Sequence, residues 1–223
     1  VARWLRQIHP SAPADGTRYV VREEQKGGVP FVHLFREGRT LGTILLCTVN
    51  FMNILVLYSL SSWLPTMVAD AGYSTTVAAL AGAVQQVGGT IGTFALAWII
   101  SRMGFVGVLT TSFAVAAASI SLIGPSLASP ALLFVIVFIA GWSVIGAQPG
   151  INALAATFYP TYMRSTGIGW GLGVGRGGAI VGPYLGGVFL ARQWTADQLF
   201  LAAATPALIS CLAVFAFRWA AKG

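Results

Sequence analysis

Six long apolar stretches, separated by short polar turns, fill most of the chain after about residue 40. Each is long enough to cross a hydrocarbon core as a helix, which takes about 20 residues. Prolines inside several of them are compatible with this, because membrane helices tolerate proline. The pattern predicts transmembrane helices at about Thr43–Leu64, Val77–Ile100, Val106–Ile123, Ala131–Phe158, Ser165–Leu190 and Leu199–Phe217.

Residues 1–39 are more polar and contain several prolines and glycines and most of the acidic residues. We expect a short helix at Arg3–Ile8, an irregular linker, and an amphipathic helix with the sequence FVHLFREG on the membrane surface. The chain starts without Met and in the middle of loop-like sequence, so we expect it to be a piece of a longer protein. Residues 40–218 then form the membrane domain, and residues 219–223 form a short tail.

The composition supports membrane insertion, since 56% of the 223 residues are hydrophobic and 9% are charged. Soluble domains carry about 25% charged residues. The formal net charge of +7 does not predict nucleic-acid binding, because the basic residues flank apolar segments instead of forming a patch. Cys47 and Cys211 both lie in apolar segments, so neither a disulfide nor a metal site is expected, and no cofactor is predicted.

The loop charges predict an orientation. One side of the membrane receives six basic residues, namely Arg36, Arg39, Arg102, Arg164, Arg218 and Lys222. The other side receives Arg192 as its one basic residue, together with Asp70 and Asp197. By the positive-inside rule, the first side and both ends of the chain are cytoplasmic, in an inner (cytoplasmic) membrane.

Polar residues inside the apolar segments recur with a period of three segments. The first, second, fourth and fifth segments carry Asn50, Asn53 and Tyr58; Gln85 and Gln86; Gln148 and Asn152; and Arg176. The third and sixth carry only serine, threonine and cysteine as polar residues. Two such triplets in opposite orientation predict an all-α six-helix bundle with a 3+3 inverted repeat. The alternative is a chance pattern in an unrelated membrane protein.

Glycines at four-residue steps predict where helices pack closely, because small residues let backbones approach. The second segment has Gly88 and Gly92 at this step. The fifth segment has two rows, which contain Gly167, Gly171 and Gly175, and then Gly178, Gly182 and Gly186, with Pro183 beside them.

Arg176 is the candidate with the strongest functional signal. It lies twelve residues after Arg164, which is roughly 18 Å of helix. If Arg164 marks the membrane surface, Arg176 lies near the midplane, where a charge usually marks a substrate path. Gly169 and Gly173 share its face and leave room for the guanidinium. The alternative is a structural arginine bound to backbone carbonyls, but no carboxylate lies within the six segments to pair with it.

The amides offer two interpretations. Gln148 and Asn152 are four residues apart and share a helix face, as Asn50 and Asn53 do. They could simply bond helices together, for about 0.6–2 kcal/mol each. As a set with Tyr58 and the two glutamines of the second segment, they predict a polar cavity around Arg176. Gln85 and Gln86 are adjacent, so only one of them can point inward.

An enzyme is not predicted. The GxGxxG pattern at Gly173–Gly178 follows no strand, so the context of a dinucleotide site is missing. The two histidines, His9 and His33, lie outside the apolar segments and cannot activate a nucleophile there.

Several motifs carry a resemblance to a known family. They are LYSLSSWLPT (Leu57–Thr66), QQVGGTIG (Gln85–Gly92), GAQPGINALAATFYP (Gly146–Pro160), a YPT turn with arginine and glycines (Tyr159–Trp170), Arg176, and GxxxGPxxGG (Gly178–Gly187). With them the sequence resembles the major facilitator superfamily over Val29–Phe217. More narrowly, it is similar to the aromatic acid:proton symporters, which include 4-hydroxybenzoate and protocatechuate transporters.

The resemblance implies the C-terminal half of a transporter, with residues 1–39 as the end of its cytoplasmic central loop. It implies proton-coupled uptake of an aromatic carboxylate by alternating access, together with an N-terminal six-helix half that carries the proton. Arg176 corresponds to the family's membrane arginine. Arg164 and Arg102 are expected at the cytoplasmic gate, although Ser101 stands where the family's gate motif has aspartate. The alternatives are a facilitator for another organic anion, a sugar or a drug, and a self-assembling six-helix channel or half-transporter.

Overall fold

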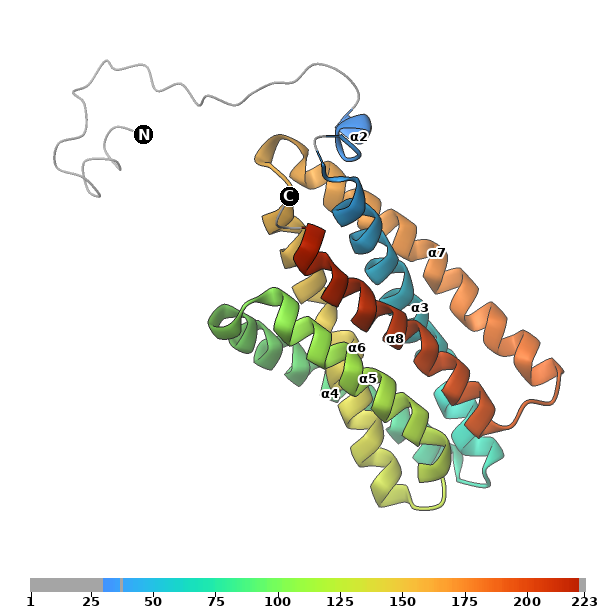
Figure 1. Cartoon of the computed structure of the whole chain (residues 1–223). Helices are drawn as coiled ribbons and strands as arrows, with labels where there is room; N and C mark the ends of the chain where they lie inside the picture. The colour runs from blue at the N-terminus through green and yellow to red at the C-terminus, as the bar shows by residue number, and fades with distance from the viewer. Residues whose placement is uncertain (1–29, 37, 221–223) are drawn as a thin grey trace, which may run out of the picture.

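The computed structural model describes residues 30–36 and 38–220, and every regular element in that part of the chain is helical. Six long helices run alternately up and down (Figure 1). They are α3 (Thr40–Asp70), α4 (Thr75–Met103), α5 (Phe105–Ser126), α6 (Pro130–Phe158), α7 (Arg164–Ala191) and α8 (Ala196–Ala220). The predicted all-α six-helix bundle is therefore confirmed.

Two short elements complete the described chain. The four-residue helix α2 (Pro30–His33) precedes α3, and the single 3-10 turn η1 (Thr161–Met163) joins α6 to α7. The helix predicted at Arg3–Ile8, and the linker after it, lie outside the described residues.

Five of the six long helices have both the length and the hydropathy of a membrane span. The exception is α7, which has 28 residues but is rich in glycine and contains Arg164 and Arg176. Its length alone is sufficient to cross a hydrocarbon core.

Local chemistry sets several helix boundaries. The hydroxyl of Ser74 caps α4 and accepts the backbone N–H of Val77 at 3.4 Å. Gly104, with a φ of +84°, separates α4 from α5 in a conformation that glycine adopts without strain. Pro130 is the first residue of α6. Proline is tolerated there because a backbone N–H at this position would have no partner within the helix.

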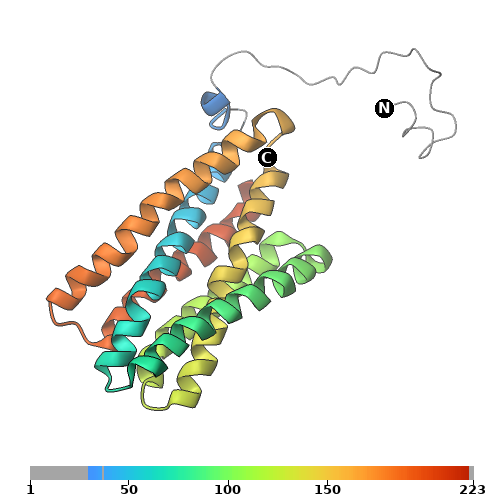
Figure 2. The same ribbon diagram turned by 180° about the vertical axis from the view of Figure 1, so that it is seen from behind.

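The helix pairings repeat with an internal two-fold symmetry. α4 packs along α6, and α7 packs along α3. Likewise, α5 packs on α6 and α8 packs on α3. Exchanging the first triplet (α3, α4, α5) with the second (α6, α7, α8) converts each pairing into the other, as an inverted repeat requires. The helices α5 and α8 lie together on one face (Figure 1), and α3, α4, α6 and α7 form the opposite face (Figure 2).

Glycines make the contact between α7 and α3 close. Six glycines on one stripe of α7 are buried: Gly167, Gly171, Gly175, Gly178, Gly182 and Gly186. A Cβ at Gly182 would lie 2.6 Å from the carbonyl oxygen of Leu55, and one at Gly178 would meet the carbonyl oxygen of Phe51. Any side chain at these positions would therefore force the two backbones apart.

The same contact recurs between α4 and α6. A Cβ at Gly88 would meet the carbonyl oxygen of Phe138, and a Cβ at Gly92 would meet that of Trp142. Both triplets thus use a pair of glycines, four residues apart, against carbonyl oxygens of the equivalent helix.

Two predicted boundaries were wrong. The first span does not end at Leu64, because α3 continues through Pro65 to Asp70. Met67 and Val68 beyond the proline are buried, and their burial favours continued helix. The surface helix predicted for FVHLFREG is only the short α2. Leu34, which follows the last residue of α2, is fully buried. Gly38 has a φ of +78° where the chain turns toward α3.

Candidate functional site

Four of the predicted amides meet between α3 and α6. Asn53 Nδ2 donates to Gln148 Oε1 at 2.8 Å, and Gln148 Nε2 donates to Asn50 Oδ1 at 3.1 Å. Gln148 Nε2 also lies 3.5 Å from Asn152 Oδ1. Gln148 is therefore the hub of a hydrogen-bonded cluster that joins the first helix of one triplet to the first helix of the other.

The amide cluster is mostly buried. Asn50 and Asn53 are 2% and 1% exposed, and Gln148 is partly buried. Asn50 Nδ2 also donates to the carbonyl oxygen of Leu46 at 3.1 Å. These hydrogen bonds offset the cost of burying the polar side chains, because a buried polar group without a partner is unfavourable. The hydrogen bonds between α3 and α6 therefore support the interpretation that the amides bond helices together.

One acceptor of the cluster is still unsatisfied. Asn53 Oδ1 is buried and has no hydrogen-bond partner among the described residues, and the same holds for Gln85 Nε2 on α4. Gln85 is 2% exposed and its neighbour Gln86 is exposed, so α4 turns one glutamine inward and one outward. Buried polar atoms without partners are uncommon and require an explanation, such as a bound water or ligand.

Arg176 lies near the middle of α7 and is exposed. Its neighbour Gly175 packs on Ile54 of α3, and one residue further along a helix is a rotation of about 100°. The guanidinium therefore lies beside the α3 contact and not within it. Within residues 30–36 and 38–220, Arg176 has neither a hydrogen bond nor an ion pair. Tyr58 on α3 is also exposed, at 38%.

The structure brings together only part of the predicted site. Asn50, Asn53, Gln148 and Asn152 form one cluster, whereas Arg176, Tyr58, Gln85 and Gln86 form no side-chain hydrogen bond with it. Two grooves of about 360 Å³ occur elsewhere, one along α3 and α7 and one along α4, α5 and α6. Neither is lined by a predicted substrate-binding residue. Among the described residues of the predicted site, Arg176, Tyr58 and Gln86 are exposed.

The predicted gate arginines lie at one end of the bundle. Arg164 is the first residue of α7 and is exposed. Arg102 lies in the last turn of α4, with its guanidinium 5.3 Å from the ring centre of Trp98. This arginine-rich end also carries Arg36, Arg39 and Arg218, whereas the described carboxylates, Asp70 and Asp197, lie at the opposite end.

Sequence reasoning missed a buried hydrogen-bond chain at the arginine-rich end. Tyr159, 2% exposed, donates to Thr43 Oγ1 at 3.2 Å, and Thr43 Oγ1 donates to the carbonyl oxygen of Leu34 at 2.8 Å. Gly167 packs directly on the ring of Tyr159. Burial raises the pKa of the Tyr159 phenol, so it remains a neutral donor. The chain ties the segment before α3 to the turn between α6 and α7.

Comparison with known proteins identifies the family. The model of the Major Facilitator Superfamily matches residues 46–223. The chain belongs to the major facilitator superfamily. This facilitator fold is also seen in the crystal structure of the Escherichia coli fucose:proton symporter FucP, with a TM-score of 0.73 and 18% identity. The match covers 92% of this chain and 50% of that one.

The facilitator chain is also similar to curated transporters. It is 36% identical over 216 residues to the 4-hydroxybenzoate transporter PcaK of Pseudomonas aeruginosa, covering 96% of this chain and 48% of that protein. It is 37% identical to the gallate transporter of Pseudomonas putida, over 91% of this chain and 45% of that protein. It is 34% identical to the benzoate transport protein of Acinetobacter baylyi, over 86% and 41%. The chain thus spans about half the length of the curated relatives it matches.

Proposed function

We propose that this chain is the C-terminal half of a secondary transporter that takes up an aromatic carboxylate together with a proton. The observation that carries the proposal is an exposed arginine at mid-span of α7 without a partner among the described residues, in a facilitator similar to transporters named for aromatic acids. A second six-helix half would cover the open face of α3, α4, α6 and α7 and enclose the site, consistent with the half-length matches.

In this proposal Arg176 binds the carboxylate of the substrate. A guanidinium stays protonated and offers two parallel N–H groups, which fit the two oxygens of a carboxylate. Its distance from the start of α7 at Arg164 corresponds to roughly 18 Å, which is the depth of a midplane site. Gly169 and Gly173 share the helix face of Arg176, and a Cβ at either would have no atom of the described chain within 4 Å, so this face leaves room for the guanidinium.

The amide cluster lines the proposed site beside Arg176. Gln148 holds α3 and α6 together, and the unsatisfied Asn53 Oδ1 can accept a hydrogen bond from a water molecule or a substrate group. Gln85, Asn152 and Tyr58 supply further polar contacts from three helices, whereas Gln86 turns outward on α4. Such groups orient a substrate, whereas the arginine supplies the opposite charge.

The proton and the gate need different residues. No Asp or Glu lies in the described stretch between Tyr73 and Asp197, so the proton carrier is assigned to the other half. Arg164 and Arg102 serve the gate at the arginine-rich end, which we place in the cytoplasm, with both ends of the chain, at an inner membrane. The other half, the organic anion, the proton and the lipid bilayer are the proposed partners.

Uptake by the full-length protein tests this function. Proteoliposomes with an imposed proton gradient should accumulate a labelled aromatic acid, and a protonophore should abolish the accumulation. A panel of hydroxybenzoates, benzoate, an aliphatic acid and a neutral sugar would identify the substrate class. Uptake of the sugar alone, or uptake unaffected by the protonophore, would contradict the proposal.

A further inference from the structure

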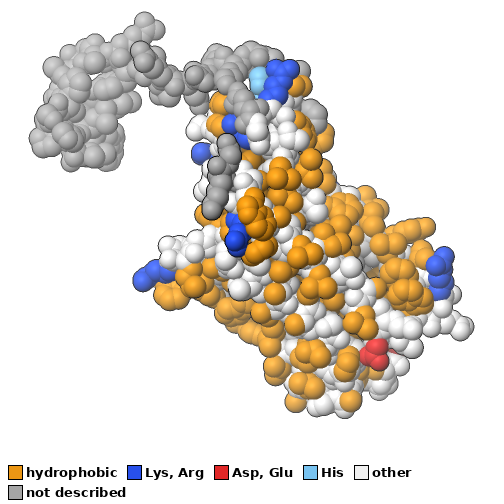
Figure 3. Space-filling model, viewed as in Figure 1, with side chains coloured by type: hydrophobic (Ala, Val, Ile, Leu, Met, Phe, Trp, Pro, Cys, Tyr) orange, Lys and Arg blue, Asp and Glu red, His pale blue; other side chains and the backbone are white. Residues whose placement is uncertain are grey.

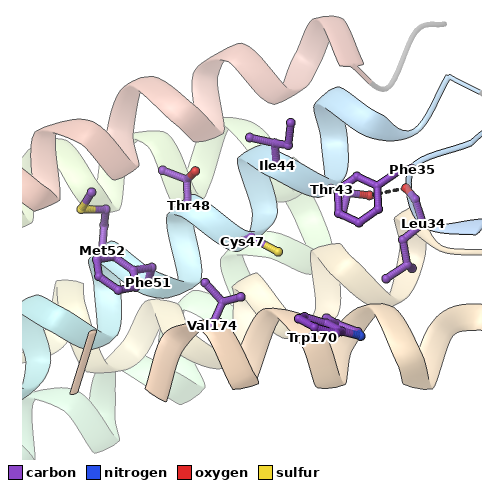
Figure 4. A pocket seen from close by; sticks show the side chains of 10 residues that line it. All are labelled: Leu34, Phe35, Thr43, Ile44, Cys47, Thr48, Phe51, Met52, Trp170 and Val174. Atoms are coloured by element: carbon purple, nitrogen blue, oxygen red, sulfur yellow. Dashed lines mark hydrogen bonds between the residues drawn. The ribbon is translucent and has the colours of Figure 1, made fainter. Parts of the chain in front are cut away.

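A groove along α3 and α7 lies apart from the proposed substrate site. It has a volume of about 360 Å³ and is partly open. Figure 4 shows the side chains that line it. Its walls come from α3, α7 and the turn after α2: Leu34, Phe35, Thr43, Ile44, Cys47, Thr48, Phe51, Met52, Trp170 and Val174. It begins at the arginine-rich end and runs toward the middle of α3.

The groove and Arg176 lie on different sides of the contact between α7 and α3. Val174 and Arg176 lie on either side of Gly175, and each is rotated by about 100° from it, in opposite directions. Gly175 packs on α3, so Val174 enters the groove while Arg176 lies on the other side of the α3–α7 contact. The groove therefore does not receive the substrate that Arg176 is proposed to bind.

The chemistry of the groove suits a hydrocarbon chain. Nearly all of its wall is apolar, and the hydroxyl of Thr43 is already bonded to the carbonyl oxygen of Leu34. Hydrophobic side chains also cover much of the face shown in Figure 3. Thr48 carries the other hydroxyl of the wall, so a polar solute entering the groove would lose most of its hydration for few hydrogen bonds, whereas an acyl chain has no hydrogen bonds to lose.

Positive charge stands at the mouth of the groove. Phe35 lines the groove, and the exposed Arg36 follows it directly. Arg39 precedes the first residue of α3, and its Nη2 lies 3.5 Å from the hydroxyl of Tyr162. The described carboxylates, Asp70 and Asp197, lie at the other end of the bundle. Trp170, 45% exposed, adds an aromatic ring of the kind that anchors proteins at the membrane interface.

We infer that this groove holds an acyl chain of an anionic phospholipid, with the lipid phosphate held at the arginine-rich end by Arg36. The phosphate accounts for the charge at the mouth, and the chain accounts for the apolar walls behind it. Basic residues at a membrane surface attract anionic lipids, so the preference over a zwitterionic lipid follows from the same geometry.

Quenching by brominated lipids tests the inference, because Trp170 lines the groove. The full-length protein is placed in nanodiscs that contain increasing fractions of phosphatidylglycerol or phosphatidylcholine with brominated acyl chains. Subtracting the signal of Trp170→Phe isolates the fluorescence of Trp170. We expect phosphatidylglycerol to quench it at a lipid fraction about fivefold lower than phosphatidylcholine does, which corresponds to one basic residue.

Matched variants test the charge at the mouth and the space inside the groove separately. Arg36→Gln should remove the preference for phosphatidylglycerol, while Arg218→Gln, at the same end of the bundle, should keep it. Val174→Phe should fill the groove and weaken quenching by both lipids, whereas Leu122→Phe on the exposed face of α5 should not. Equal quenching by the two lipids, or a preference that survives Arg36→Gln, would overturn the inference. So would a Trp170 signal that neither lipid quenches, because protein would then cover the groove.

Discussion

Asn53 of α3 donates a hydrogen bond of 2.8 Å to Oε1 of Gln148 on α6. This bond joins the two helices that correspond under the internal symmetry of the bundle. Removing Gln148 leaves buried polar groups of two asparagines unpaired, which typically costs about 1–3 kcal/mol. Gln148→Leu should therefore lower the melting temperature of the purified full-length protein. Gln86→Leu, at an exposed position of α4, should change it little.

A double-mutant cycle isolates the Asn53–Gln148 bond. Asn53→Leu and Gln148→Leu should each destabilise the protein, and together they should cost less than the sum of the two, since the second removes groups that have already lost their partner. Strictly additive losses would contradict the assignment of this bond.

Two glycines of α7 form a matched pair for close packing. A Cβ at Gly178 would meet the backbone of α3, with Leu55 N at 3.0 Å, whereas at Gly173 no atom lies within 4 Å. Gly178→Ala should destabilise the protein by about 1–3 kcal/mol through overpacking. Gly173→Ala should be neutral or stabilising by up to about 1 kcal/mol, because alanine favours helix. Thermal unfolding of both variants is the measurement, and equal effects would contradict the packing described.

The six helices and their symmetry could be predicted because the signals are local. Apolar length sets the spans, and glycines such as Gly88 and Gly178 recur at fixed positions in each triplet. The partner of an amide could not be predicted in this way. Helical period tells which face Asn53 occupies, but its contact with Gln148, 95 residues later, depends on how α3 crosses α6.

The same limit explains why Tyr159 was missed. Its place beside Pro160 marks a helix end, but its partner Thr43 lies 116 residues earlier. For Gln85 and Gln86 the sequence was sufficient in part, because adjacent residues on a helix cannot both point inward. The structure turns Gln86 outward and buries Gln85.

The Tyr159 chain should stiffen the arginine-rich end. Tyr159→Phe keeps the ring on Gly167 but removes the bond to Thr43, for an expected loss of about 0.5–1.5 kcal/mol. Hydrogen exchange should rise around residues 34–43. Tyr73→Phe removes a comparable bond, to the carbonyl oxygen of Leu127 at 2.6 Å, and should leave that segment unchanged. Equal exchange around residues 34–43 in the two variants would argue against a local tie.

Arg164 should affect movement more than binding. It lies twelve residues from Arg176, roughly 18 Å along α7, and therefore cannot share its ligand. We expect Arg164→Ala to lower the transport rate about tenfold or more by disturbing the gate. Substrate affinity should stay close to that of the unaltered protein, as it should in the control Arg218→Ala. Transport assays with calorimetric binding separate the two effects, and a large loss of affinity with normal turnover would refute this division.

The most direct test of the whole account is the binding of a carboxylate and its neutral analogue to Arg176 variants. Removing one partner of a desolvated charge pair typically costs about 3–5 kcal/mol, or two to four decades of affinity. Arg176→Ala should therefore lose 4-hydroxybenzoate almost completely, and Arg176→Lys should retain little, because lysine lacks the two-pronged geometry. Arg192→Ala is the control, because Arg192 directly follows the last residue of α7.

The neutral ligand decides the interpretation. 4-Hydroxybenzamide should bind the unaltered protein weakly and lose little more in Arg176→Ala, because it carries no charge for the guanidinium to pair. Calorimetry of both ligands with both full-length proteins gives the four affinities required. A selective loss of the acid is the result we predict. An equal loss of both ligands, or of neither, would show that Arg176 is structural and that the carboxylate binds elsewhere.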